Sequence, residues 1–380
     1  MGVALLLAGF ATFALMYDVQ PLLPLFAAQF GVNAATSSLA VSLTTGTMAL
    51  AFVPAAVLSD RVGRRPLMIF ALLASAALTV GSALVPGWTE FLSVRAAIGL
   101  VLAGVPSVAM AYVSEEVHPD SVGSAMGLYI AASALGGMTG RLGMAFISQY
   151  LGWRAAVGIM GAAAVAAGLA FAVFAPRSHA FVPVQHDVRS LARAMRGLLA
   201  DRVLPLLYAE AFLLMGVFVT VYNYLSFRLE APPYNLSQAA VGAVFLVYLL
   251  GSVSSAWIGG LASRRGPARV LWMPIAVLAA GIALTAVRPL GAVLCGIAIL
   301  TTAFFAAHST ASGWVGRRAT RNRAQATALY LLFYYLGASL LGSAGGLAWN
   351  QARWPGVAGF TLMLSVTGLM IAVRLRKMEP

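Results

Sequence analysis

Charged residues are scarce in this chain. Only 9% of its 380 residues are Asp, Glu, Lys or Arg, whereas 61% are hydrophobic and the mean hydropathy is +0.89. A soluble domain carries about a quarter charged residues, which cover the surface that faces water. Most of this chain therefore cannot face water, and a membrane protein is predicted.

Cysteine is almost absent as well. The single Cys295 lies within an apolar run, which excludes an intrachain disulfide and a cysteine-based metal site. No Gly-x-x-x-x-Gly-Lys-Ser/Thr loop occurs, so ATP drive within this chain is not expected. We expect no cofactor, no metal site and no enzymatic activity, with a membrane-embedded enzyme or a receptor as the rival classes. The four histidines do not cluster with carboxylates inside the apolar runs: His118, His179, His186 and His308.

Long apolar runs take up most of the chain. About 20 apolar residues cross a bilayer as a helix, which satisfies its own backbone hydrogen bonds. Membrane β-strands would alternate apolar and polar residues, and these runs do not. We therefore predict an all-α membrane protein with twelve transmembrane helices, at about 3–28, 36–58, 66–86, 89–113, 121–147, 153–175, 203–228, 238–262, 268–287, 290–313, 325–348 and 355–374.

The second half of the chain repeats the first. The charged turn Ala56–Arg65 recurs in weakened form as Gly259–Ala268, 203 positions later, and Trp153 is followed 201 positions later by Trp354. Parallel repeats of this kind are typical of carriers that rock around a site near the bilayer midplane. The predicted organisation is a six-helix half at 1–175, a cytoplasmic linker at 176–202 and a second six-helix half at 203–380.

The net charge of +13 does not indicate nucleic-acid binding, because the positive residues are distributed along the chain as membrane topology requires. With the N-terminus inside, 18 of the 24 Lys and Arg residues fall in cytoplasmic segments, which predicts that both termini are cytoplasmic. The loop 114–120 departs from this pattern of positive cytoplasmic segments, because it carries three acidic residues. Acidic residues influence membrane orientation little. In the linker, the stretch from Val188 to Asp201 is either a plain tether or a basic helix on the anionic inner surface.

The first charged turn has the composition of a latch at the membrane surface. Asp60 can hold an arginine or a helix N-terminus there, and Gly63 allows the chain segments to approach closely. The second copy has Ser263 in place of the acid. The predicted cytoplasmic gate consists of Asp60, Arg61, Gly63, Arg64, Arg65 and Arg264.

Several motifs resemble those of the major facilitator superfamily. Leu58–Arg65 looks like that family's signature between helices two and three, with Ala56 where the signature opens with Gly. Arg95–Gly99 is similar to an Arg-x-x-Gln-Gly pattern, with Ile98 replacing Gln. Gly136–Arg141 partly resembles an exporter signature, and with Tyr17–Pro24 it is similar to the YnfM-like branch of drug and sugar exporters. The resemblance implies the major facilitator fold, a monomer and a role for Arg95 in proton coupling.

Charges inside the apolar runs are costly and are therefore candidates for function. Asp18 is expected about 15 Å deep from the outer surface, and Arg95 and Arg141 about 10 Å deep. Asp18 and Arg95 can pair if their helices are neighbours, either as a proton-coupling pair or as a permanent structural one, unless Asp18 faces water. Arg141 binds an anionic group or closes the outer gate, or it is a helix-end arginine that reaches to the interface. Glu210 is the rival proton carrier, unless its side chain reaches the surface near Arg202.

Aromatic and polar residues on later helices are candidates to line a substrate cavity. Tyrosines suit amphipathic ligands, but they also form ordinary interfacial belts. His308 is equally consistent with a packed side chain. The predicted cavity residues, besides Arg141, are Tyr222, Asn223, Tyr330, Tyr334 and His308.

These observations favour secondary active transport. The leading hypothesis is proton-coupled export, by alternating access, of a small organic molecule such as a drug-like amphiphile or a sugar. The alternative is proton-coupled uptake of a small organic acid, since two arginines and one aspartate leave a net positive site in the first half. The expected partners are a small-molecule substrate, protons and the lipid bilayer, with no nucleic acid, and the expected location is the bacterial inner membrane.

Overall fold

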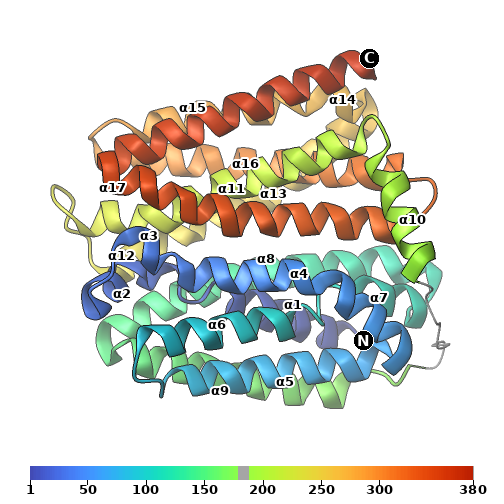
Figure 1. The fold of residues 1–380 in the computed structure, drawn as a ribbon, viewed down its shortest axis with the longest axis horizontal. Coiled ribbons are helices and arrows are strands. Elements are labelled where there is room, and N and C mark those ends of the chain that lie inside the picture. Colours follow the sequence, from blue (N-terminus) through green and yellow to red (C-terminus); the bar gives the residue numbers. More distant parts are fainter. Residues whose placement is uncertain (179–187, 380) are drawn as a thin grey trace. The chain divides into compact units, whose positions relative to one another are not determined.

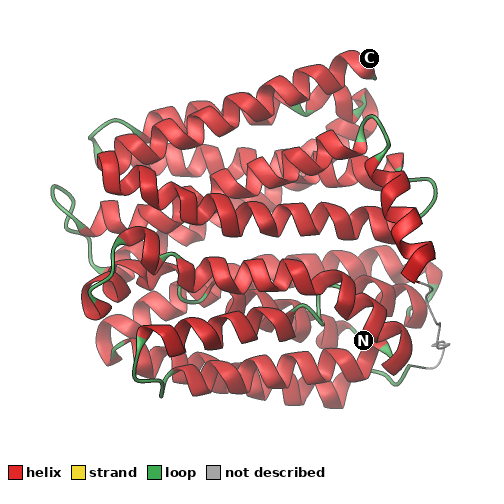
Figure 2. Cartoon of the chain, in the orientation of Figure 1, coloured by secondary structure: helices red, strands yellow, loops and turns green. Residues whose placement is uncertain are grey.

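The computed structural model describes residues 1–178 and 188–379. Within those ranges every regular element is a helix, and Figure 2 shows the helices joined by short loops. The chain forms two compact units, each described here by itself. Residues 179–187 of the predicted linker, with His179 and His186, lie outside the described residues.

The first unit comprises residues 1–31, 39–187 and 237–245. Its last segment comes from the second half of the sequence, and the Ala239 N–H donates a hydrogen bond of 2.8 Å to Gln149 Oε1. The helices, in chain order, are α1 (Gly2–Tyr17), η1 (Gln20–Leu22), α2 (Leu23–Phe30), α4 (Leu39–Val62), α5 (Arg64–Ser82), α6 (Trp88–Leu102), α7 (Ala109–Glu116), α8 (Pro119–Leu151), α9 (Trp153–Phe174) and α12 (Gln238–Ala243), which η2 (Val244–Val247) extends beyond the unit.

The second unit comprises residues 32–38, 188–236 and 246–380. It includes a short segment from the first half, which packs against α17. Figure 1 shows α11 and α17 running side by side. The helices are α3 (Ala34–Ser37), α10 (Val188–Leu199), α11 (Leu204–Glu230), α13 (Tyr248–Arg265), α14 (Pro267–Val270), α15 (Trp272–Thr285), α16 (Leu290–Arg318) and α17 (Arg323–Met378).

Ten helices of the described chain are long and apolar enough to span a membrane. The difference from the predicted twelve arises in two places. The fourth predicted span is broken into α6 and α7 around Pro106, which has no N–H to donate to a helix. The last two predicted spans lie within α17, which is kinked by non-helical backbone at Ala352 and Arg353.

The repeat seen in the sequence recurs in the backbone. Gly63 and Gly266 both have positive φ, 97° and 85°, and each directly precedes a new helix. Gly152 before Trp153 has φ 79°, and Arg353 before Trp354 has φ 51°. The kink inside α17 therefore lies where the first unit turns from α8 into α9.

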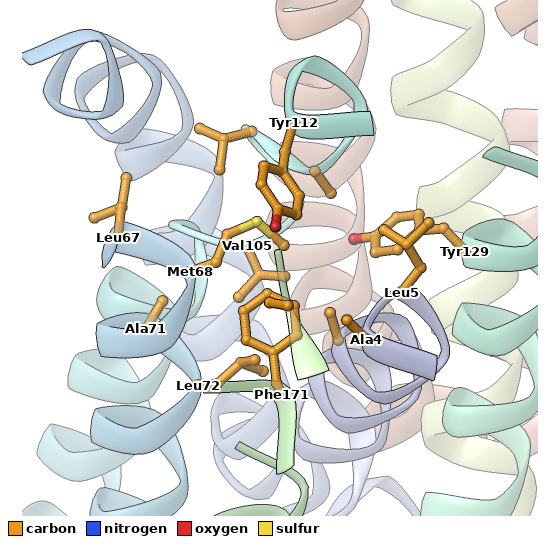
Figure 3. Packing of buried hydrophobic residues seen from close by; sticks show 14 of the residues in the cluster. Ala4, Leu5, Leu67, Met68, Ala71, Leu72, Val105, Tyr112, Tyr129 and Phe171 are labelled. Carbon is orange, nitrogen blue, oxygen red and sulfur yellow. The ribbon is translucent and has the colours of Figure 1, made fainter. Parts of the chain in front are cut away.

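An apolar cluster holds the first unit together at one end. Figure 3 shows Met68, Val105, Tyr112 and Phe171 packed against one another, with Ala4 and Leu5 of α1 beside them. These side chains are buried, and they come from four helices and the turn that separates α6 from α7. The cluster therefore fixes α1, α5, α7 and α9 near the charged turn that begins α5.

Glycines at equivalent positions bring the long helices of each unit together. A Cβ at Gly136 of α8 would overlap the carbonyl oxygen of Phe10 in α1. A Cβ at Gly337 of α17 would overlap the carbonyl oxygen of Phe212 in α11 in the same way. Without an aqueous driving force between helices, such close backbone contact supplies much of the packing energy.

Gly136→Val and Gly337→Val should each destabilise the protein by about 1–3 kcal/mol, because the added methyls force the helices apart. Gly127→Val and Gly359→Val are matched controls on the same two helices, where an added Cβ meets nothing within 4 Å. Thermal unfolding of the purified protein in detergent checks the difference. Equal losses in all four variants would contradict the packing account.

Candidate functional site

The centre of the first unit holds a buried ion pair. Arg95 Nη1 of α6 donates a hydrogen bond of 2.9 Å to Asp18 Oδ1 at the end of α1. The two side chains are 1% and 0% exposed. This burial contradicts the alternative that Asp18 faces water. The Val19 N–H donates to the same Asp18 oxygen at 2.8 Å, while Asp18 Oδ2 has no hydrogen-bond partner within the described chain.

Arg95 also binds the backbone of two other segments. Its Nε donates to the carbonyl oxygen of Ala40 in α4 at 3.0 Å, and its Nη2 donates to that of Met16 in α1 at 3.1 Å. Thr44 Oγ1 in turn donates to the Arg95 carbonyl oxygen at 3.0 Å. The guanidinium thus joins α1, α4 and α6, and its place beside Asp18 does not depend on the carboxylate alone.

Arg141 of α8 lies in the same unit and is 2% exposed. The alternative that Arg141 is a helix-end arginine whose side chain reaches the membrane interface is therefore wrong. Its Nε donates to Gln20 Oε1 at 2.6 Å, and its guanidinium lies 4.2 Å from the centroid of the Tyr17 ring and 5.3 Å from that of Phe245. Arg141 is close enough to Asp18 for a Coulombic interaction. Asp18, Arg95 and Arg141 therefore form one buried charged group.

The charged turn forms a compact cluster at the end of α4. Arg64 pairs with Asp60, one helical turn before it, and with Glu115 of α7 at 3.1 Å. Arg65 donates to the carbonyl oxygens of Ala172 and Ala175 at 2.6 and 3.0 Å. These carbonyls end α9, where a cation is favourable. The sequence did not predict Glu115 as a partner of Arg64, although Glu115 lies in the acidic loop 114–120 that departs from the pattern of positive cytoplasmic segments.

The second copy of the turn lacks this cluster. Gly266 adopts the same backbone conformation as Gly63, but Arg264 is exposed and has no ion pair within the described chain. Ser263, which replaces the acid, donates to the carbonyl oxygen of Gly259 at 2.9 Å instead. Arg61 of the first copy is exposed as well. Of the predicted gate side chains, Asp60, Arg64 and Arg65 therefore take part in the cluster, together with Glu115.

In the second unit, Glu210 of α11 is 0% exposed. Neither carboxylate oxygen has a hydrogen-bond partner among the residues described. The alternative of a side chain that reaches the surface near Arg202 is therefore wrong. Gly368 of α17 packs against the acid, because a Cβ added there would lie 3.1 Å from Glu210 Oε2, and Tyr330 is within Coulombic range.

The aromatic residues predicted to line a cavity pack against one another in this unit. His308 Nδ1 lies 3.0 Å from Tyr330 Oη, and the Tyr334 ring centroid lies 4.7 Å from that of His308. Tyr222 Oη lies 2.7 Å from Thr301 Oγ1, and Asn223 is fully buried on the same helix. Tyr330 thus connects the surroundings of Glu210 to His308.

The sequence and the fold of this chain are matched by known proteins. Residues 3–342 match the profile of the Major Facilitator Superfamily. The chain belongs to this superfamily. The predicted all-α major facilitator fold is thereby confirmed, and the protein is a multi-pass membrane transporter.

Two relatives place the chain more narrowly. It is 41% identical over 374 residues to the inner membrane transport protein YnfM of Escherichia coli (strain K12), covering 98% of this chain and 90% of that protein. It is 40% identical over 365 residues to the uncharacterized MFS-type transporter YybF of Bacillus subtilis (strain 168), covering 96% and 90%. The predicted YnfM-like branch is confirmed, and both relatives are named as transporters.

Solved structures share the fold at low sequence identity. A bacterial homolog of the human lysosomal transporter Spinster, inward-facing and occupied, aligns with a TM-score of 0.79 at 16% identity, covering 99% of this chain and 95% of that one. A mutant of the nucleoside transporter NupG aligns with a TM-score of 0.78 at 16% identity, covering 97% and 99%.

Arg95→Met should lower the free energy of unfolding by about 3–5 kcal/mol, because Asp18 is left buried without its cation. The double variant Asp18→Asn/Arg95→Met should recover part of that loss, since no charge then remains uncompensated. Thermal unfolding of the four proteins in a double-mutant cycle measures the coupling, with Arg61→Met as the exposed control. Additive effects would show that the pair contributes no stability.

Proposed function

We propose that the chain is a proton-coupled secondary active transporter that exports a small organic molecule by alternating access. The proposed substrates are drug-like amphiphiles or sugars. Proton entry supplies the energy, since one charge moved inward releases about 2.3 kcal/mol per 100 mV. We place the protein in the bacterial inner membrane, because its relative YnfM is named an inner membrane transport protein. We expect both termini to be cytoplasmic and the protein to act as a monomer.

The buried pair of Asp18 and Arg95 carries this proposal. A proton on Asp18 removes the negative charge that holds the Arg95 guanidinium, and Asp18 Oδ2 is free to receive it. Arg95 keeps its hydrogen bonds to the backbone of α1 and α4. Protonation therefore loosens one specific contact between α1 and α6 without leaving the arginine unbound. Such a contact can couple proton occupancy to helix movement.

Glu210 is the rival carrier in the second unit. An ionised carboxylate without a partner is costly to bury, and a bound proton removes that cost. Tyr330 lies within Coulombic range of Glu210, and its hydroxyl oxygen is 3.0 Å from His308 Nδ1, so the two residues offer a polar route through an aromatic region. We assign Glu210 a second, subordinate step, because Asp18 is the acid whose protonation changes an ion pair.

Uptake of a small organic acid is the second candidate function. Among the described residues, the buried charges of the first unit are Asp18, Arg95 and Arg141, which leave one positive charge. Such a surplus favours an anionic ligand. Export is preferred because Arg141 already contacts an amide oxygen and two aromatic rings, and aromatic surfaces suit amphiphiles.

A thermal-shift screen at pH 6 and pH 8 separates the two functions. Purified protein is mixed with panels of lipophilic cations, sugars and small organic acids. Export predicts stabilisation by cations or neutral amphiphiles that strengthens at pH 8, where an acid is free to bind. Stabilisation by organic acids that strengthens at pH 6 would instead establish the uptake function.

Asp18→Asn should abolish transport driven by a pH gradient while leaving substrate exchange measurable, since the neutral amide cannot release a proton. The measurement uses proteoliposomes, the compound selected by the screen and a pH-sensitive dye inside the vesicles. Glu210→Gln is the matched variant, and it should slow coupled transport without uncoupling it. If Asp18→Asn still couples to the gradient and Glu210→Gln does not, the carriers are assigned the wrong way round.

A further inference from the structure

A cavity outside the buried charged groups lies at one end of the second unit. Helix α10 runs across the ends of α11 and α17, as Figure 1 shows. An open cavity of about 470 Å³ is lined by α10, the start of α11 and the turn that joins α16 to α17. Its polar lining consists of Arg193, Asp201, Arg318, Thr320, Arg321 and Asn322.

One wall of this cavity is held in place by ion pairs. Arg318 donates to Asp201 Oδ2 at 3.0 Å and to Glu379 Oε1 at 2.7 Å. Asp201 Oδ1 accepts from the N–H groups of Val203 and Leu204 at 2.8 and 3.0 Å. Asp201 thereby binds the backbone at the N-terminus of α11 and fixes Arg318 at the end of α16.

The Asp201 carboxylate remains ionised, and both of its oxygens already accept hydrogen bonds. Partial burial acts to raise its pKa, but the hydrogen bonds from Leu204 and Val203 and from Arg318 outweigh that effect and lower the pKa below its ordinary value. Its charge is used by Arg318 and the helix N-terminus. It therefore does not neutralise the other cations of the cavity.

Two arginines remain available to a ligand. Arg193 projects from α10 and Arg321 from the turn between α16 and α17, and both are exposed and line the cavity. Neither has an ion pair within the part of the chain that the structure describes. With Arg318 balanced by acids, the cavity carries positive charge from α10 and from the α16–α17 turn that no acid of the described chain pairs with.

The position of the cavity along the membrane normal indicates which anion it binds. Its walls include the N-terminal end of α11, the C-terminal end of α16 and the turn before α17. The helices α11, α16 and α17 are all candidate membrane spans. Ends of spanning helices lie where the hydrocarbon gives way to lipid headgroups. The apolar Leu198 of α10 is buried, as expected for an amphipathic helix at that interface. Phosphates of anionic lipids are concentrated at this level on the cytoplasmic side.

We propose that this cavity binds the phosphate group of an anionic phospholipid, with Arg193 and Arg321 as the two donors. Guanidinium groups bind phosphate oxygens through paired, charge-assisted hydrogen bonds. A bound lipid would bridge α10 to the α16–α17 turn and hold the end of the linker on the second unit. The proposal is independent of the transported substrate and of proton coupling.

The test measures lipid binding to the delipidated full-length protein by native mass spectrometry. The variant Arg193→Gln/Arg321→Gln removes both proposed donors. Its matched control, Arg196→Gln/Arg317→Gln, removes the same charge from the same helix and from the adjoining helix end, at exposed positions outside the cavity. Dioleoylphosphatidylglycerol should bind about tenfold more weakly to the cavity variant, and with unchanged affinity to the control.

Two further arms identify the source of the phosphate. Dioleoylphosphatidylcholine should bind both double variants and the unaltered protein equally. Inorganic phosphate should not displace phosphatidylglycerol at equal concentration, and displacement would overturn the lipid assignment in favour of a free anion. Equal weakening in the cavity variant and the control would show diffuse surface attraction and would also overturn it. If the double variant does not fold, the exposed single substitution Arg193→Gln should weaken phosphatidylglycerol binding about threefold.

Discussion

Arg95 is the constraint on which the first unit depends. Its guanidinium binds one carboxylate and the backbone of two helices inside a region where an unpaired charge is costly. Asp18 must therefore remain at the end of α1, and α1, α4 and α6 must meet at that level. Functionally, the carboxylate is the one part of this network that can be switched off by a proton, while the backbone contacts persist. Stability and proposed coupling thus depend on the same atoms.

The two units share their packing but not their charges. Gly136 and Gly337 bring equivalent helices into backbone contact, and Gly63 and Gly266 turn the chain in the same way. The ion pairs do not repeat in the described residues, where Asp60 has Ser263 as its counterpart and the buried carboxylate of the second unit, Glu210, has no hydrogen-bond partner. Close packing thus recurs in both halves, whereas the buried charges differ between them. The asymmetry supports the proposal that proton coupling centres on the first unit.

The fold was largely predictable from the sequence, because runs of apolar residues and the repeated turn follow directly from membrane physics. The break at Pro106 and the sharp kink at Arg353 were not, since hydropathy reports where a span can lie and not how its backbone is hydrogen-bonded. Depth along the helices allowed Asp18 and Arg95 to meet only if their helices are neighbours, and that condition came from the family resemblance. Depth could not identify Glu115 as the partner of Arg64, or the cavity beneath α10, because both depend on which side chains converge from distant segments.

The most direct test of the central claim is infrared difference spectroscopy of the purified protein as the pH is stepped. The account predicts a carboxylic-acid carbonyl band that grows on acidification, together with loss of a carboxylate band. One component of both bands should be missing in Asp18→Asn and should persist in Glu210→Gln. If no component is lost in Asp18→Asn, the claim that the ion pair of the first unit is the proton switch is contradicted.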